Sequence, residues 1–181
     1  MGLNSILKRD EEITTRLRLK DPHSRIKPFA IFLAHSGDSW FILPGLFLIW
    51  LLTDGLCHHM TAIMATGAVG LAIIVLIIKF TIRRRRPEGQ WGAIYRNTDP
   101  HSFPSGHAAR TALLAVIAIA INPLWLGLLL MVWALLVSLA RVWLGVHYLS
   151  DVLAGLLLGI LAGVMVLQIS PWLTATFPVI F

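Results

Sequence analysis

Long apolar stretches separated by short polar segments run along most of the chain. The first that is apolar enough to cross a bilayer covers residues 40–53, with extension from its flanks. Four more follow at residues 60–78, 104–121, 124–143 and 150–169. Because most of these stretches approach the ~20 residues that span a hydrocarbon core, the pattern predicts an all-α integral-membrane helical bundle of about five transmembrane helices.

Proline and short polar runs mark the expected breaks between these helices. Residues 29–34 are apolar but too few to span, and they are followed by the polar residues 35–39. If residues 28–53 contain two segments, the bundle has six spans instead of five. The Asn122-Pro123 pair predicts a tight turn, and Pro171 is expected to end the last helix.

The first 27 residues are basic and amphipathic. Ile6, Leu7, Ile13 and Leu17 fall on roughly one side of a helix, and Lys and Arg side chains elsewhere suit anionic headgroups. We expect residues 1–27 to form an N-terminal amphipathic interfacial helix, with a solvated tail as the alternative. Residues 28–181 then form a single transmembrane domain.

Composition supports a membrane rather than an aqueous setting. Of 181 residues, 57% are hydrophobic and 13% are charged, and the mean hydropathy is +0.78. A soluble domain does not carry such an excess of apolar side chains. The net charge of +6 would suit nucleic acid, but a chain that lies mostly in lipid argues against that partner. The single Cys57 excludes an intrachain disulfide.

Ionisable side chains gather in three polar motifs at the ends of the predicted helices. The first motif covers residues 79–87 and the second is Pro104-Ser-Gly-His107. The third runs from Arg141 through His147 to Asp151. Five spans place all three motifs at the same membrane face. Since ionisable groups near lipid are kept mainly where they have a role, the motifs predict a functional site.

These motifs contain the groups that a phosphate ester needs. Cations and N–H donors suited to its negative charge are supplied by Lys79, Arg84, Arg86, Arg141, Ser105 and Gly106. Ser105 and Gly106 begin a predicted helix, where free backbone N–H groups and the helix dipole favour an anion. Arg83 and Arg85 are expected to anchor the chain at the membrane surface.

Three further side chains have the chemistry to cleave such an ester. Asp151 follows His147 by one helical turn, so the two side chains can lie side by side. The carboxylate then accepts from one imidazole nitrogen and leaves the other free to attack phosphorus. His107 protonates the leaving oxygen, and later takes a proton from the water that hydrolyses the phosphohistidine. No step requires a metal or another cofactor.

Each motif taken singly has a simpler explanation. An Arg run after an apolar helix is most often a positive-inside anchor, and Pro-Ser-Gly is a common turn. A His-x-x-x-Asp pair is more often a structural hydrogen bond than a catalytic dyad. The joint occurrence of the three motifs, in this order and at one face, favours the catalytic interpretation.

The motifs resemble the signature of the type 2 phosphatidic acid phosphatase family of integral-membrane lipid phosphatases. The family pattern is Lys-x6-Arg-Pro, then Pro-Ser-Gly-His, then Ser-Arg-x5-His-x3-Asp, and the resemblance covers about residues 36–165. It implies a phosphatase domain with His147 as nucleophile, Asp151 as its partner and His107 as acid. It also implies phosphate binding by Lys79, Arg86, Ser105, Gly106 and Arg141. Ala140 stands where the family usually has Ser, which removes one hydroxyl donor.

The expected reaction is hydrolysis of the phosphate or diphosphate of a membrane lipid. A lipid phosphotransferase would share the phosphohistidine, an anion transporter would share the cations, and a vanadate-binding haloperoxidase would share the motif logic. Lipid-embedded spans count against the haloperoxidase, and the lack of mid-span charge counts against the transporter. Phosphatidate, phosphatidylglycerol phosphate, polyprenyl diphosphate and a lipid A phosphate all fit the site.

The distribution of basic residues predicts the orientation. Five spans put all 15 Lys and Arg on the side of the N-terminus and the motifs. The positive-inside rule then predicts an active site on the cytoplasmic face of a bacterial cytoplasmic (inner) membrane. Six spans would place the site on the outer face.

Overall fold

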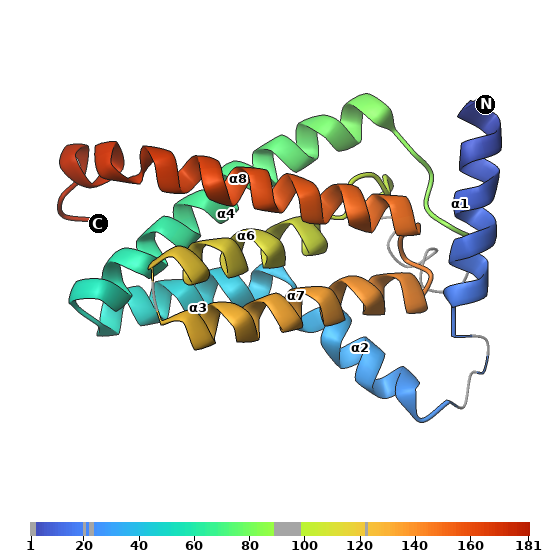
Figure 1. Ribbon diagram of the computed structural model, residues 1–181, viewed down its shortest axis with the longest axis horizontal. Helices are drawn as coiled ribbons and strands as arrows, with labels where there is room; N and C mark the ends of the chain where they lie inside the picture. Colours follow the sequence, from blue (N-terminus) through green and yellow to red (C-terminus); the bar gives the residue numbers. More distant parts are fainter. Residues whose placement is uncertain (1–2, 20, 22–23, 89–98, 122) are drawn as a thin grey trace.

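The computed structural model describes residues 3–19, 21, 24–88, 99–121 and 123–181. These residues form seven helices, which confirms the all-α prediction. They are α1 (Leu3–Leu17), α2 (Ile26–Ser36), α3 (Ser39–Leu52), α4 (Gly55–Ile82), α6 (Gly106–Ile121), α7 (Leu124–Trp143) and α8 (Leu149–Thr176). Helices α3, α4, α6, α7 and α8 run along the bundle, and α1 lies across one end of it (Figure 1).

Several helices are long and apolar enough to cross a membrane. Helices α4, α7 and α8 have 28, 20 and 28 residues and pass this test individually. Helices α2 and α3 pass it only together, as a pair bent by 54° at the polar break near Gly37. Helix α6 has 16 residues and is shorter. The chain is an integral membrane protein, and the count of five spans stays a prediction.

Helix α6 forms the centre of the bundle, packed against α4, α7 and α8. Its approach to α8 is close because two glycines of α8 face the α6 backbone. A Cβ added at Gly155 would lie 2.5 Å from the carbonyl oxygen of Ser105, and one at Gly159 would lie 2.0 Å from that of Ala109. In lipid, such small residues let helix backbones pack tightly where no hydrophobic drive brings them together.

The prediction that Pro171 ends the last helix was wrong, since α8 continues to Thr176 with Pro171 inside it. Proline lacks the N–H that would bond to the carbonyl of Leu167 four residues earlier. The hydroxyl of Ser170 donates to that carbonyl at 2.8 Å, so the polar group is satisfied and the helix is able to continue. At the predicted Asn122-Pro123 turn, Asn122 lies outside the described residues.

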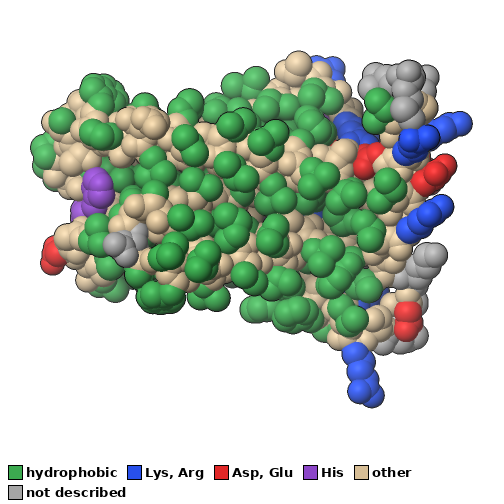
Figure 2. Space-filling view, viewed as in Figure 1, with side chains coloured by type: hydrophobic (Ala, Val, Ile, Leu, Met, Phe, Trp, Pro, Cys, Tyr) green, Lys and Arg blue, Asp and Glu red, His purple; other side chains and the backbone are tan. Residues whose placement is uncertain are grey.

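Charged and apolar side chains divide the surface of the molecule. Apolar side chains cover the length of the bundle, while most of the Lys, Arg, Asp and Glu side chains in view gather at the end where α1 lies (Figure 2). Lys20 and Arg96, which were predicted to lie on the same side of the membrane, are outside the described residues. On α1, Ile6 is 53% exposed and Ile13 is 46% exposed, a pattern that suits a helix at a membrane interface.

Candidate active site

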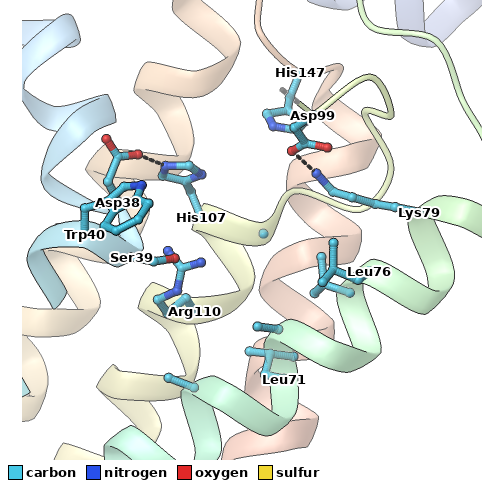
Figure 3. A pocket seen from close by; sticks show the side chains of 14 residues that line it. Asp38, Ser39, Trp40, Leu71, Leu76, Lys79, Asp99, His107, Arg110 and His147 are labelled. Atoms are coloured by element: carbon cyan, nitrogen blue, oxygen red, sulfur yellow. Dashed lines mark hydrogen bonds and ion pairs between the residues drawn. The ribbon is translucent and has the colours of Figure 1, made fainter. Parts of the chain in front are cut away.

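A cavity of about 350 Å³ lies at the charged end of the bundle (Figure 3). Its walls come from the start of α3, the second half of α4, the loop before α6, the start of α6 and the loop before α8. Four of the predicted site residues line it, namely Lys79, Gly106, His107 and His147. Leu71 and Leu76 of α4 supply an apolar wall that leads away from the charged groups. The first, second and third motifs therefore meet in one cavity.

The end of α7 places His147 in this cavity. The N–H of Leu144 bonds to the carbonyl of Ala140 at 3.0 Å, and the chain then turns at Gly145, whose φ is +65°. Only glycine adopts this conformation readily, and a Cβ here would also meet the Arg18 side chain at 2.1 Å. The N–H of His147 bonds back to the carbonyl of Arg141 at 3.3 Å, which explains why these two residues act from one short segment.

The His147 imidazole is buried, and its two ring nitrogens face different partners. Nε2 lies 3.2 Å from Nη1 of Arg86. Nδ1 lies 3.6 Å from Oδ2 of Asp151, which is longer than a hydrogen bond, and it has no hydrogen-bond partner among the described residues. Burial, together with the positive charges of Arg86, Arg141 and Lys79, holds the pKa of His147 well below its ordinary value of 6.5. A neutral imidazole is the form that a nucleophile requires.

Asp151 is fully buried in the first turn of α8, and Arg84 and the Tyr148 backbone are among the donors that hold its carboxylate. The Arg84 guanidinium donates from Nη1 to Oδ1 at 2.7 Å. The backbone N–H of Tyr148 donates to Oδ2 at 2.9 Å. These bonds hold Oδ2 at 3.6 Å from Nδ1 of His147, so the two side chains lie side by side but the predicted hydrogen bond between them is not formed.

His107 is paired with a carboxylate that sequence reasoning did not assign to the site. Its Nε2 lies 2.5 Å from Oδ1 of Asp38, in the break between α2 and α3. Asp38 also accepts from Nδ1 of His35 at 2.9 Å. A carboxylate at one ring nitrogen fixes the tautomer and the orientation of an imidazole. The signal available in the sequence was an acidic residue within an otherwise apolar region, next to the polar break.

Two of the cations from the first motif, Lys79 and Arg86, converge on another unpredicted acid, Asp99. Lys79 Nζ contacts Oδ2 of Asp99, and Arg86 Nη2 donates to the same oxygen at 2.7 Å. Arg86 Nε also donates to the backbone carbonyl of Asp99 at 2.6 Å. The carboxylate thus bonds to two cations that were predicted to bind phosphate, and Figure 3 shows the contact with Lys79. Asp99 belongs to a polar loop whose sequence has no spacing that would have singled it out.

Ser105 directly precedes α6 and Gly106 begins it at the cavity wall, but one part of their predicted role is wrong. The backbone N–H of Ser105 is not free, because it donates to the carbonyl of Asp151 at 2.9 Å. The Ser105 hydroxyl is buried and has no hydrogen-bond partner among the described residues, so it is the group of this residue suited to a ligand. A Cβ at Gly106 would lie 3.5 Å from Val75, and this is ordinary contact.

The remaining two predicted cations occupy different places. Arg141 is 1% exposed, and its charge acts on His147. Arg84 lies behind Asp151 and outside the cavity lining, where it bonds to Asp10 and Asp151 and stacks on the Tyr148 ring at 4.0 Å. Its predicted contact with phosphate stays a prediction that this geometry does not favour. Within the described part of the chain, no group of three or more His, Cys, Asp or Glu is placed to hold a metal ion.

Fold and site together define an integral-membrane helical bundle with two histidines, their acidic partners and several cations around one cavity at its charged end. The sequence profile described as the PAP2 superfamily matches residues 55–175. The chain belongs to the PAP2 superfamily, which confirms the resemblance to the type 2 phosphatidic acid phosphatases.

Solved structures agree on the fold. A PAP2-type phosphatidylglycerolphosphate phosphatase from Bacillus subtilis aligns with a TM-score of 0.75 at 24% identity, over 94% of this chain and 88% of that one. LpxE from Aquifex aeolicus aligns with a TM-score of 0.71 at 22% identity, over 87% of this chain and 93% of that one.

Similar sequences carry phosphatase names. An undecaprenyl-diphosphatase of Sulfolobus acidocaldarius is 33% identical over 107 residues, which is 52% of each chain. A decaprenylphosphoryl-5-phosphoribose phosphatase of Mycobacterium tuberculosis is 35% identical over 105 residues, which is 58% of each chain. The match therefore spans a little over half the length of these relatives.

Proposed function

We propose that the protein hydrolyses a phosphate or diphosphate group of a membrane lipid through a phosphohistidine on His147. The observation that carries this proposal is the shared cavity, where His107 and His147 lie with Lys79 above the apolar side chains of α4. A lipid phosphate needs charged groups at its headgroup and apolar walls along its chain, and this cavity supplies both.

The phosphate would bind between the cations that now hold Asp99. Lys79 and Arg86 offer donors that suit its equatorial oxygens, and binding would displace the Asp99 carboxylate. The buried hydroxyl of Ser105 is a further donor beside the cavity. Since Arg86 Nη1 lies 3.2 Å from Nε2 of His147, a phosphate bound to Arg86 would lie next to that nitrogen.

In the first half-reaction, Nε2 of His147 attacks phosphorus. The P–N bond forms as the P–O bond to the leaving group breaks, and the electron pair of that bond goes to the leaving oxygen. Asp151, near Nδ1, stabilises the positive charge that develops on the ring. His107 donates a proton to the leaving oxygen, and Asp38 holds its ring in place for this transfer.

The second half-reaction reverses these roles. His107 takes a proton from a water molecule, and the water oxygen attacks phosphorus as the P–N bond breaks. His147 returns to its neutral form and inorganic phosphate leaves. If a second lipid hydroxyl replaced the water, the same intermediate would make the protein a phosphotransferase.

The names of the relatives favour one class of lipid. Those of both the Sulfolobus and the Mycobacterium proteins specify a polyprenyl-linked phosphate. A polyprenyl diphosphate or a polyprenyl-linked phosphate is therefore the substrate class we propose to test first. Phosphatidate, phosphatidylglycerol phosphate and a lipid A phosphate complete the panel.

The site lies at the end of the bundle where α1 and the charged side chains gather (Figure 2). By the positive-inside rule, we place this end at the cytoplasmic face of a bacterial cytoplasmic membrane. A reporter fused to the carboxyl terminus tests the orientation, because Figure 1 shows this terminus at the opposite end of the bundle. A reporter active only on the outer side is the expected result, and cytoplasmic activity would contradict it.

The activity itself is tested by phosphate release from the lipid panel in the presence of a chelator. The parent protein should release phosphate from at least one lipid, and His147→Ala should release none. His59→Ala removes a histidine at the other end of the bundle and should behave as the parent. Equal release by the parent and His147→Ala would overturn the assignment of the nucleophile. Transfer of the phosphate to a second lipid would favour the phosphotransferase.

A further inference from the structure

Helix α1 caps the helix that carries Asp151. The first N–H groups of a helix have no partner within it, and in α8 two of them bond to side chains from α1. The N–H of Leu149 donates to the hydroxyl of Thr14 at 3.0 Å, and the N–H of Ser150 donates to Oδ1 of Asp10 at 3.1 Å. These bonds join residues far apart in the sequence, so α8 begins where α1 fixes it.

Asp10 also holds the guanidinium that orients Asp151. Nη2 of Arg84 donates to Oδ2 of Asp10 at 2.6 Å, while Nη1 donates to Oδ1 of Asp151 at 2.7 Å. The guanidinium is thus shared between two carboxylates, with one nitrogen for each. The hydroxyl of Ser150 joins the same group, since it accepts from Arg84 Nη1 at 2.6 Å and lies 2.5 Å from Oδ2 of Asp10.

This cluster is shielded from water. The side chains of Asp10 and Arg84 are 11% and 16% exposed, and that of Asp151 is 0% exposed. Thr14 is 1% exposed, whereas most of the described side chains of α1 are exposed. Exposed ion pairs contribute little because solvent screens them and their side chains move, but these contacts are too buried for that objection to apply.

We infer that α1, through Asp10 and Thr14, is a positioning element for catalysis. Without the Asp10 carboxylate, both nitrogens of Arg84 become available to Asp151, and a bidentate pair of this kind is the preferred geometry. Such a pair would draw the carboxylate toward Arg84 and away from Nδ1 of His147, which already lies 3.6 Å distant. Asp10 and Thr14 touch neither substrate nor reacting atoms, so they act through Asp151. The inference rests on the proposed function.

The test compares Asp10→Asn, Asp10→Glu and Glu12→Gln with the parent on a lipid phosphate that the parent hydrolyses. Glu12→Gln is the matched control, because it makes the same change of charge at an exposed position of the same helix. We expect Asp10→Asn to lower kcat by about tenfold, the size typical of partners that orient a reacting group. KM should change by less than about twofold, since the phosphate-binding cations lie on the other side of Asp151. Asp10→Glu keeps the carboxylate and should recover most of the lost kcat.

A merely structural cap would lower the amount of folded protein without lowering kcat per folded molecule. Parental kcat in Asp10→Asn would therefore overturn the inference, and so would an equal loss in Glu12→Gln. If Asp10→Asn does not purify as a monodisperse species, Thr14→Val tests the same cap with all charges retained. Parental kcat in Thr14→Val would also overturn the inference. A parent that releases no phosphate from any lipid contradicts the proposed function instead.

Discussion

Replacing Gly159 by alanine is expected to push α8 away from α6 and so disturb the active site from a distance. The added Cβ would lie 2.0 Å from the carbonyl oxygen of Ala109 and 2.8 Å from its carbonyl carbon. Non-bonded heavy atoms prefer to lie about 3.5 Å apart. Because the clash is with backbone rather than with a flexible side chain, it is relieved only by separating the two helices by about 1 Å or more.

The displacement would reach Asp151, which lies about two turns earlier on α8. At that level the two helices are joined by the bond from the Ser105 N–H to the Asp151 carbonyl, at 2.9 Å. Overpacking of this kind typically costs about 1–3 kcal/mol of stability. A misplacement of about 1 Å at a catalytic group can reduce the rate by about 100-fold. We expect Gly159→Ala to lower both the apparent unfolding temperature and kcat, with kcat down by about 10- to 100-fold.

The assay measures the apparent unfolding temperature in detergent and phosphate release per folded molecule. Gly70→Ala is the matched control, because no described atom lies within 4 Å of a Cβ added at this glycine of α4. This control should retain parental values for both quantities. Parental unfolding temperature and kcat in Gly159→Ala would refute the reasoning, since they would show that α6 and α8 tolerate the extra methyl group.

Three further predictions concern the cavity. Gly106→Ala should leave the unfolding temperature unchanged, because the added Cβ meets only Val75 at 3.5 Å. If phosphate approaches the Gly106 backbone, the added methyl group should raise KM. An unchanged KM would exclude that approach. Since the pKa of His147 is held well below 6.5, protonation removes the nucleophile only at lower pH. A pH series should therefore show kcat/KM, which reports groups of the free enzyme, maintained as pH falls through 6.5, and a half-loss near 6.5 would count against a buried neutral imidazole. Asp99→Asn removes a carboxylate that competes for Lys79, and a charged hydrogen bond of this kind contributes about 1.5 kcal/mol. Inhibition by inorganic phosphate should then tighten by about tenfold, and weaker inhibition would contradict the competition.

The fold was largely predictable because hydropathy and helix length follow directly from the bilayer. The predicted stretch at residues 60–78 lies within α4, and that at residues 104–121 contains α6. Helix ends were harder to predict, because local hydrogen bonds decide them. At Pro171 the Ser170 hydroxyl replaces the missing backbone donor. The pattern of apolar residues does not indicate that hydrogen bond.

The site was predictable where spacing within one segment determines geometry. The four-residue step from His147 to Asp151 brings the two side chains to 3.6 Å, although His147 lies in the loop before α8 and not one helical turn from Asp151 as expected. Asp38, Asp99 and Asp10 were not assigned to the site, because each reaches it through a contact between distant parts of the chain. An acidic residue in a loop or on an amphipathic helix is usually solvated, so the residue type alone does not mark such a contact. The Ser105 amide shows the same limit, since its partner is a backbone carbonyl on another helix.

The shortness and central position of α6 have a consequence for how the protein enters the membrane. A segment is inserted on its own when the transfer of its side chains to lipid is favourable, and an arginine opposes this most strongly at the helix centre, where it costs about 2.5–3.5 kcal/mol, and less toward a helix end. Helix α6 has 16 residues, carries Arg110 and contacts protein on α4, α7 and α8. Its favourable surroundings are other helices rather than lipid. We expect α6 to be inserted together with α7 as a hairpin, so that biogenesis depends on the segment that is synthesised after it.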